Sequence, residues 1–239
     1  MKKKVLITGA SSDIGVETVK KFIHNDFEVT AHCYKNIKYL EKIKSKYPRN
    51  LKIFSYDFKK IDKFERFIKK KRKFFEKFNS LIFLTGFNEP KNFSSLSIKS
   101  INEHLNVNYF ANFLIFREVV NSMIKKKWGR ILFTSSIGVK FGGGDKTFAY
   151  SFSKYASEFF PAFLKKQTKH GILYNCLRIG VTDTKIHRLV KNKDMKSRIK
   201  LIPLKRAAKP IEIADYIYFL SSDSNQQISN QILNISGGE

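Results

Sequence analysis

Cysteine is scarce in this chain of 239 residues, and the two that occur, Cys33 and Cys176, stand inside apolar runs. Two such residues cannot form the disulfide framework of a small secreted protein, and they fit a reducing compartment. We therefore expect the cytoplasm. The five histidines and two cysteines show no spacing typical of a metal site, so no bound metal is predicted.

Long apolar runs are also missing. No stretch approaches the ~18 uninterrupted apolar residues of a membrane-spanning helix, although hydrophobic residues make up 42% of the sequence. That fraction is ordinary for a protein with a globular core. The length, and the lack of a repeat or linker, predict one domain over residues 1–239 that does not bind a membrane.

Acidic residues are few, since 46 Lys and Arg stand against 20 Asp and Glu, which gives a formal charge of +26. Such an excess attracts anions, so nucleic acid, an acidic protein or a phosphorylated cofactor would fit it, as would a mere preference for lysine. The basic residues are spread along the chain, in runs such as 69–73, 125–127 and 191–200. Because no nucleic-acid-binding module is recognisable, nucleic acid is not the predicted partner.

Apolar residues alternate between short continuous runs, typical of strands, and three- and four-residue spacing, typical of helices. Strands are predicted at 5–7, 27–33, 51–56, 81–84, 131–134, 172–177 and 232–235, and helices at 14–23, 37–47, 61–68, 101–124, 150–166 and 211–220. Pro161 is expected to bend the fifth helix. The alternation predicts an α/β fold of the Rossmann type, a doubly wound parallel sheet. The unpatterned segment 180–206 is interpreted as a mobile substrate flap.

The segment Thr8-Gly9-Ala10-Ser11-Ser12-Asp13-Ile14-Gly15 lies between the first strand and the first helix. Backbone N–H groups and the positive end of the helix favour an anion there, and small residues let the anion approach the backbone. The sequence therefore predicts a phosphate-binding turn.

These residues resemble the TGxxxGxG fingerprint of the short-chain dehydrogenase/reductase family, and the resemblance extends along the chain. Further landmarks follow in family order: Asp57 after the third strand, Gly86 in the NNAG motif, Asn108, Ser136, the YxxxK pair Tyr150 and Lys154, the segment 179–184, the helix 206–214 and the last segment 236–238. The resemblance is strongest to 3-oxoacyl-carrier-protein reductases. It implies an NAD(P)-dependent oxidoreductase that interconverts a ketone and a secondary alcohol.

Three departures from the family pattern matter. Asp13 replaces the middle glycine of the fingerprint, and we expect its side chain to cap the following helix. The NNAG segment reads Phe83-Leu84-Thr85-Gly86, so the hydrogen bonds of both asparagines must be replaced or absent. Ile179 stands where the family has proline.

Tyr150 and Lys154 are four residues apart and would share one helix face. A neighbouring ammonium lowers the pKa of a phenol and makes it a better proton-transfer group. The resemblance implies that Tyr150 exchanges the proton, Ser136 holds the carbonyl, Lys154 binds the nicotinamide ribose and Asn108 anchors a water. Taken singly, Ser136 could be a cap, Asn108 a polar residue inside a helix, and Lys154 a surface charge.

The resemblance also implies the residues that bind the cofactor. They are Gly9, Ser11, Ser12, Asp13, Ile14, Gly15, Tyr34, Lys35, Asp57, Phe58, Gly86, Lys154, Gly180, Thr182 and Thr184. The end of the second strand, 31–36, carries no carboxylate that could bind a ribose 2′-OH, whereas Lys35 could pair with a 2′-phosphate. NADP(H) is the preferred cofactor, and NAD(H) is the alternative.

The resemblance implies a 3-oxoacyl thioester as substrate, tethered to an acidic acyl carrier protein. Arg130 and 169–170 fall near the positions where carrier-specific relatives present basic residues. A sugar or sugar nucleotide of a surface-polysaccharide pathway is the second substrate class, suited to His187, Arg188 and Lys191. A non-catalytic module that binds a cofactor or nucleic acid is the alternative of another class. A homotetramer or homodimer is expected, through the helices at 101–126 and 150–168.

Overall fold

The computed structural model describes residues 2–185 and 195–239. Seven strands form one sheet in the order β3-β2-β1-β4-β5-β6-β7, and every neighbouring pair is parallel. The predicted strands are confirmed, with small shifts at their ends. Their bounds are β1 Lys4–Thr8, β2 Glu28–Cys33, β3 Leu51–Ser55, β4 Ser80–Phe83, β5 Gly129–Ser136, β6 Ile172–Ile179 and β7 Gln231–Ile235.

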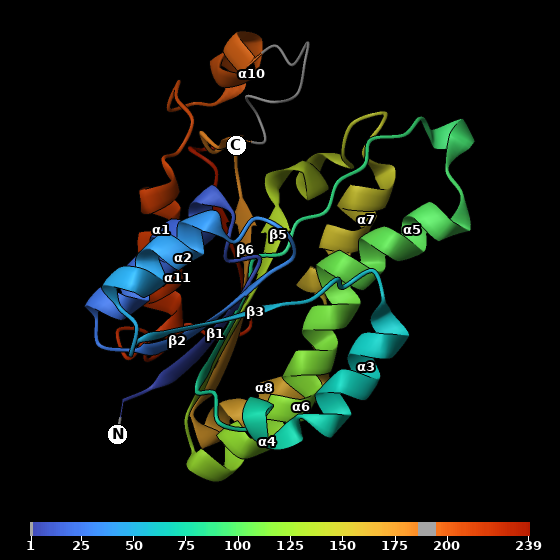
Figure 1. Ribbon diagram of the computed structural model, residues 1–239. Coiled ribbons are helices and arrows are strands. Elements are labelled where there is room, and N and C mark those ends of the chain that lie inside the picture. Colours follow the sequence, from blue (N-terminus) through green and yellow to red (C-terminus); the bar gives the residue numbers. More distant parts are fainter. Residues whose placement is uncertain (1, 186–194) are drawn as a thin grey trace.

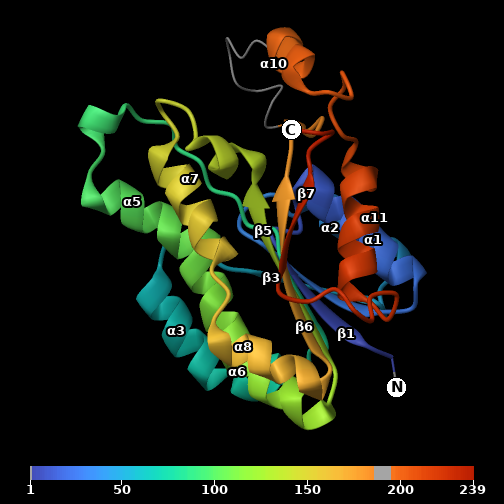
Figure 2. The same ribbon diagram turned by 180° about the vertical axis from the view of Figure 1, so that it is seen from behind.

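Helices cover both faces of this sheet (Figure 1). One face carries α1 Asp13–His24, α2 Lys38–Lys46 and α11 Pro210–Ser221, and the other carries α3 Ile61–Lys70, α4 Arg72–Phe75, α5 Ile98–Leu105, α6 Ala111–Lys126, α7 Phe148–Tyr155 and α8 Ala162–Gln167. The view from behind in Figure 2 shows the same two layers, with α10 Met195–Leu201 beyond the carboxyl ends of the strands. Short 3₁₀ turns lie at Phe93–Ser95, Ile137–Phe141, Ala156–Glu158 and Thr168–His170. The predicted Rossmann-type doubly wound fold is confirmed.

The alternation of side chains along the strands builds two cores. Val5 and Ile7 of β1 pack on the side of α1 and α11, whereas Leu6 packs on the side of α3 and α6. Successive residues of a strand point to opposite faces, so a strand covered by helices on both sides must be apolar throughout. This requirement explains the continuous apolar runs in the sequence.

Both long helices predicted from the sequence are interrupted. The first divides into α5, a π-helical turn at Asn106–Phe110, and α6. The second ends at Tyr155 and a 3₁₀ turn, after which Phe159 and Pro161 are extended and α8 begins. Proline has no N–H to donate and disfavours helical geometry in the residue before it, so Pro161 breaks this helix, and the prediction of a mere bend was wrong.

The segment 180–206 is only partly described, because residues 186–194 fall outside the described ranges. The predicted contacts of His187, Arg188 and Lys191 also lie outside them. The remainder is not without structure, since Thr182 forms a β-bridge with Ala208 and α10 begins at Met195. Its role as a substrate flap stays a prediction. No helix within the two described ranges is long and apolar enough to cross a bilayer.

Candidate active site

A cavity of about 1900 Å³ lies at the carboxyl ends of the strands. Open parallel sheets bind ligands at this edge, where successive strands diverge. Its wall contains every predicted catalytic and cofactor-binding residue except Gly15 and Asn108. The cavity is larger than the ~300–1,000 Å³ of most small-molecule sites, so it has room for a dinucleotide and a substrate together.

The glycine loop is pressed against the end of β4. Gly9 has φ +65°, and a Cβ built on it would lie 2.8 Å from backbone atoms of Leu84 and Thr85. A Cβ on Gly15 would lie 2.7 Å from the backbone of Ala10. Only glycine fits both places, which keeps the loop close to the start of α1, where the positive end of the helix favours an anion. This cradle fits a phosphate group.

Asp13 does not cap α1 as predicted. The cap is Ser12, whose hydroxyl accepts the Gly15 N–H at 3.0 Å. The Asp13 carboxylate instead accepts the backbone N–H of Lys185 at 2.7 Å, and the Lys185 ammonium lies 3.8 Å from it. That ammonium also donates to the Tyr39 hydroxyl at 2.6 Å. Asp13 therefore joins the glycine loop to the chain that follows β6, and a cation partly balances its charge.

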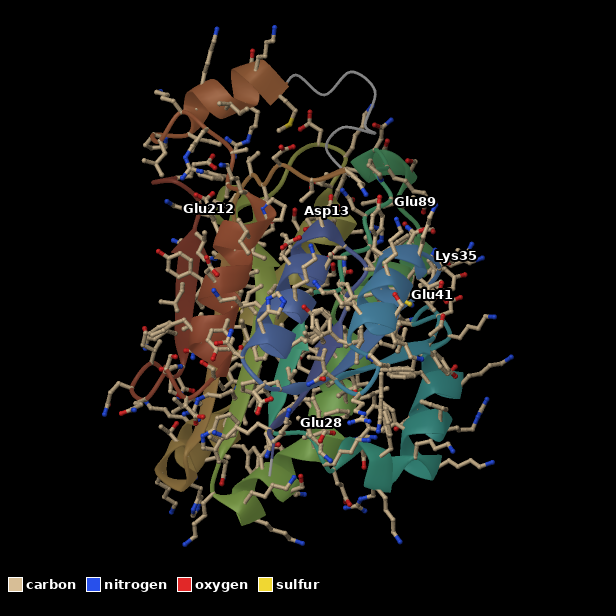
Figure 3. All side chains as sticks on the ribbon, turned by 60° about the vertical axis from the view of Figure 1, so that its left-hand side comes forward. Asp13, Glu28, Lys35, Glu41, Glu89 and Glu212 are labelled. Carbon is tan, nitrogen blue, oxygen red and sulfur yellow. The ribbon has the colours of Figure 1, made fainter. Side chains whose placement is uncertain are left out.

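The chain at the end of β2 carries one cation, Lys35, and no carboxylate between residues 31 and 36. Lys35 is exposed, with its ammonium 5.0 Å from the ring centre of Tyr34, and both residues line the cavity. Figure 3 shows Asp13 and Lys35 toward the same end of the molecule as α10, whereas Glu28 lies toward the opposite end. In this part of the cavity the side chains fit an anionic group such as a 2′-phosphate.

His32 is a cavity residue that the sequence reasoning missed. Its Nε2 donates to the Tyr56 carbonyl at 3.0 Å, and its Nδ1 accepts the Gly9 N–H at 3.4 Å. Burial lowers its pKa to about 4, so the imidazole is neutral at neutral pH. The Phe58 ring stacks on it with centroids 3.8 Å apart. Phe58 is buried, so its backbone rather than its ring is available to a cofactor.

The predicted cofactor-binding residue Asp57 lies beside Phe58 in the cavity wall. Its carboxylate accepts the backbone N–H of Lys59 at 3.1 Å, which holds the chain that leaves β3 in a turn. Gly86 also lines the cavity, but a Cβ there would meet no atom within 4 Å. No protein atom therefore requires glycine at this position.

Lys154 is a buried residue of the cavity wall. Its ammonium donates to the carbonyls of Thr85 at 2.8 Å and Thr134 at 3.0 Å. Burial lowers the pKa of Lys154 to about 8, while burial raises the pKa of Tyr150 and the nearby Ser136 hydroxyl opposes that rise. The Tyr150 pKa is therefore raised by burial and not lowered by Lys154 as predicted, and the Lys154 ammonium bonds to two backbone carbonyls.

Asn108 lies below the cavity, in the π-helical turn between α5 and α6. Its side chain accepts the Phe87 N–H at 2.6 Å and donates to the Phe87 carbonyl at 2.9 Å and the Ser153 hydroxyl at 2.8 Å. The side chain is thus committed to protein groups. Its predicted role in anchoring a water stays a prediction.

A second buried asparagine supplies the hydrogen bonds that the NNAG segment lacks. Asn112 bonds to Thr85, to the backbone of Asn108 and to Thr8. The sequence signal was an asparagine one helical turn after Asn108, which alone is too common to single out. The sequence left open whether other hydrogen bonds hold the segment 83–86 in place of the two family asparagines. Asn112 supplies such a bond, at Thr85.

The chain after β6 completes the cavity. A Cβ on Gly180 would lie 2.6 Å from Cα of Ser236, so glycine permits the close approach of the two segments that leave β6 and β7. Thr182 is buried, and its hydroxyl donates to the Gly180 carbonyl at 3.2 Å, which leaves its side chain little freedom for a cofactor. Thr184 stays in the cavity wall.

Arg130 is not the surface residue that the carrier interpretation needs. It is buried, and its guanidinium donates to the carbonyls of Gly129, Gly171, Ser222 and Asn225 at 2.8–3.2 Å. The predicted contact with a carrier at this position was wrong, because the side chain is buried and four of its five N–H groups bond to backbone carbonyls. Lys169 is exposed. Within the described part of the chain, no cluster of three or more potential metal ligands occurs.

Comparison with known proteins identifies the family and agrees with the fold. The family model for short chain dehydrogenases matches residues 3–195. A 3-oxoacyl-(acyl-carrier-protein) reductase of Buchnera aphidicola subsp. Schizaphis graminum is 27% identical over 243 residues, 99% of this chain and 97% of the relative. An acetoacetyl-CoA reductase of Allochromatium vinosum is 24% identical over 244 residues, 100% of this chain and 98% of the relative.

Among solved structures, ElxO with NADP bound matches with a TM-score of 0.86 and 24% identity, over 100% of this chain and 98% of that one. At that level of sequence identity, the match shows a shared fold and nothing about function. The match covers the whole chain and so includes the sheet and both helical layers.

Proposed function

Because this chain belongs to the short-chain dehydrogenase family and is an oxidoreductase acting between an alcohol and a carbonyl with NAD(P), we propose that it reduces 3-oxoacyl thioesters with NADPH. The observation that carries the proposal is that Ser136, Tyr150 and Lys154 line one cavity together with the glycine loop. The substrate class is supported by the names of two relatives that align over the whole chain, the 3-oxoacyl and acetoacetyl-CoA reductases.

A bound reduced nicotinamide would supply the hydride. The chain's own residues would bind the carbonyl and move the proton. Ser136 would donate a hydrogen bond to the substrate oxygen, and Tyr150, kept protonated because burial raises its pKa, would transfer its proton to that oxygen. Two N–H groups of Lys154 are held by Thr85 and Thr134, which leaves the third for a ribose hydroxyl.

The cation at Lys35 and the absence of a carboxylate between 31 and 36 support NADPH over NADH. A 2′-phosphate pairs with an ammonium, whereas a 2′-OH prefers a carboxylate acceptor. Measured dissociation constants would decide the matter. NADPH should bind at least tenfold more tightly than NADH, on the order of one charge-assisted contact, and tighter binding of NADH would overturn the choice.

An acidic acyl carrier protein is the proposed macromolecular partner, in the cytoplasm. The support is the excess of positive charge, which in Figure 3 projects as long nitrogen-tipped side chains from many sides of the molecule. A field spread in this way would speed encounter without fixing one docking site. Comparison of kcat/KM for acetoacetyl thioesters of carrier protein and coenzyme A, at low and high salt, tests the partner.

A homodimer or homotetramer is proposed through the layer of α6, α7 and α8. Exposed aromatic side chains gather along these helices and their flanking turns: Phe110, Phe113, Phe152, Tyr155, Phe159 and Phe163. Apolar surface of this kind is costly in a monomer, and a two-fold axis would bury the same surface on both copies. Mass in solution by sedimentation should exceed one chain, and Tyr155→Glu should lower it.

Oxidation of NADPH tests the function as a whole. Acetoacetyl-CoA should support turnover far better than keto-sugar nucleotides or simple diketones. If a keto-sugar nucleotide is the preferred substrate, the thioester assignment fails. If no ketone is reduced and the protein shifts nucleic acid in a salt-dependent way, the chain is a binding module and the enzymatic proposal fails.

A further inference from the structure

A buried asparagine connects three segments that meet beneath Lys154. Asn112, in the first turn of α6, is 1% exposed. Its amide nitrogen donates to the Thr85 hydroxyl at 2.8 Å and to the backbone carbonyl of Asn108 at 3.0 Å, and its oxygen accepts from the Thr8 hydroxyl at 3.0 Å. A carbonyl can only accept, so the contact with Asn108 fixes the orientation of the amide.

Two of these partners lead directly to functional groups. Thr8 immediately precedes Gly9, the glycine pressed against β4. Thr85 is held at both ends, because its hydroxyl accepts from Asn112 and its backbone carbonyl accepts from the Lys154 ammonium. One residue therefore separates the Asn112 amide from the charge of Lys154, and rotation of Thr85 would disturb both contacts.

The third partner of Asn112, the Asn108 carbonyl, is connected to α7 by a separate set of hydrogen bonds. Asn112 holds the Asn108 carbonyl, and the Asn108 side chain donates to the Ser153 hydroxyl at 2.8 Å. That hydroxyl donates to the Tyr150 carbonyl at 2.7 Å. Two chains of hydrogen bonds thus connect Asn112 with Lys154 and with the backbone of Tyr150, and every bond in them is buried except the part-buried one from Ser153 to Tyr150 within α7.

We propose that Asn112 is a positioning residue of the reduction site, which fixes the Thr85 carbonyl and the π-helical turn and so holds Lys154 and Tyr150 at the cavity. The inference deepens the proposed function and rests on the roles proposed there for Lys154 and Tyr150. Its physical basis is that a buried ammonium needs fixed acceptors, since unpaired polar groups in a core are costly.

The consequence for Lys154 is a change in its titration. Three titratable groups lie near the Lys154 ammonium. Tyr150 lies one helical turn before it, Glu158 follows it by four residues and is bound by Arg178, and Cys176 faces it from β6. Burial raises the pKa of Cys176 to about 12. The acceptors Thr85 and Thr134 stabilise the charged form. If the Thr85 carbonyl turns away, the pKa of Lys154, already lowered to about 8 by burial, falls further.

The test compares Asn112→Val with Asn175→Val. Asn175 of β6 is also 1% exposed and also bonds to two backbone groups, the Ile228 carbonyl and the Gln231 N–H, but it does not line the cavity. Both variants should unfold at lower temperature. Only Asn112→Val should lower kcat, by about thirtyfold, with the Kd for NADPH within about threefold.

A second measurement does not depend on turnover. The titration of ¹³C-labelled Lys154, assigned with Lys154→Met, should move to lower pH by about half a unit in Asn112→Val and not in Asn175→Val. If Asn112→Val does not fold, Thr85→Val replaces it, because this variant keeps the backbone carbonyl. The titration of Lys154 should then move to lower pH in Thr85→Val. Unchanged titration and unchanged kcat in the folded variants would overturn the inference. If the wild type reduces no ketone while the titration moves, the proposed function fails and the positioning role stands.

Discussion

Burial of His32 makes the stability of this protein sensitive to acid. The side chain is 3% exposed, and burial lowers its pKa to about 4, against the small opposing effect of its bond to the Tyr56 carbonyl. In the unfolded chain a histidine ionises near pH ~6.5. Between these two values the unfolded state binds more protons, so the stability is full above pH ~6.5 and is lost as the pH falls toward ~4.

The magnitude follows from the two ionisation constants. For a single group that ionises at about 6.5 when unfolded and about 4 when folded, linkage gives a loss of about 2 kcal/mol between pH 7.5 and pH 5. Urea unfolding at both pH values measures it, with His32→Gln as the variant. The carboxylates contribute equally to both proteins, so the difference between the two pH dependences isolates His32.

Phe58→Leu is the matched control, because it removes the stacked ring and keeps the imidazole. It should lower stability at both pH values by a similar amount. The loss of about 2 kcal/mol in the free energy of unfolding between pH 7.5 and pH 5 should persist in Phe58→Leu and vanish in His32→Gln. If wild type and His32→Gln lose the same stability on acidification, the burial of a neutral imidazole between Gly9 and Tyr56 does not determine this behaviour.

Three further substitutions test single charges. Asp13→Asn removes the carboxylate beside the phosphate-binding turn and should tighten NADPH about threefold by calorimetry; weaker binding would mean that the contact with Lys185 matters more than the charge. Lys35→Met should weaken NADPH about tenfold and leave NADH within about twofold; equal effects would place Lys35 away from the 2′-phosphate. Arg130→Met should cost about 2–4 kcal/mol in urea unfolding, with the kcat/KM ratio of carrier-bound to coenzyme A-bound substrate unchanged; a changed ratio would restore Arg130 as a carrier contact.

The strands and the cavity could be predicted because both depend on local pattern. A continuous apolar run such as Val5-Leu6-Ile7 predicts a strand that is covered by helices on both faces. Once the sheet is parallel, residues that follow strand ends must gather at one edge. Ser136, at the end of β5, and the glycine loop after β1 are brought together by that rule alone.

Long-range contacts could not be predicted in the same way. Asp13 has the sequence of a helix cap, but its partner Lys185 lies 172 residues away. Arg130 has the sequence of a surface residue and is buried by carbonyls from segments that only tertiary packing brings near it. His32 and Asn112 carry no motif, and their importance comes from the backbone groups that the fold places around them.

The break after α7 shows a third limit. Phe148–Tyr155 and Ala162–Gln167 have continuous helical spacing, so periodicity favoured one helix, whereas the loss of one hydrogen-bond donor at Pro161 decided the geometry. The break follows directly after Glu158, whose carboxylate is held by Arg178 and by Ser135, the neighbour of Ser136. Because Arg178 and Ser135 bond to it, the Glu158 carboxylate stays paired where the helix ends.

The most direct test of the central claim is single-turnover reduction of acetoacetyl-CoA by NADPH, with wild type and Tyr150→Phe compared beside the Kd for NADPH. Removal of one hydroxyl from the cavity wall leaves the glycine loop and Lys35 untouched. The rate should fall by about a thousandfold, with the Kd within about threefold. A Tyr150→Phe protein that reduces the thioester at nearly the wild-type rate would contradict the assignment of Tyr150 as the proton donor.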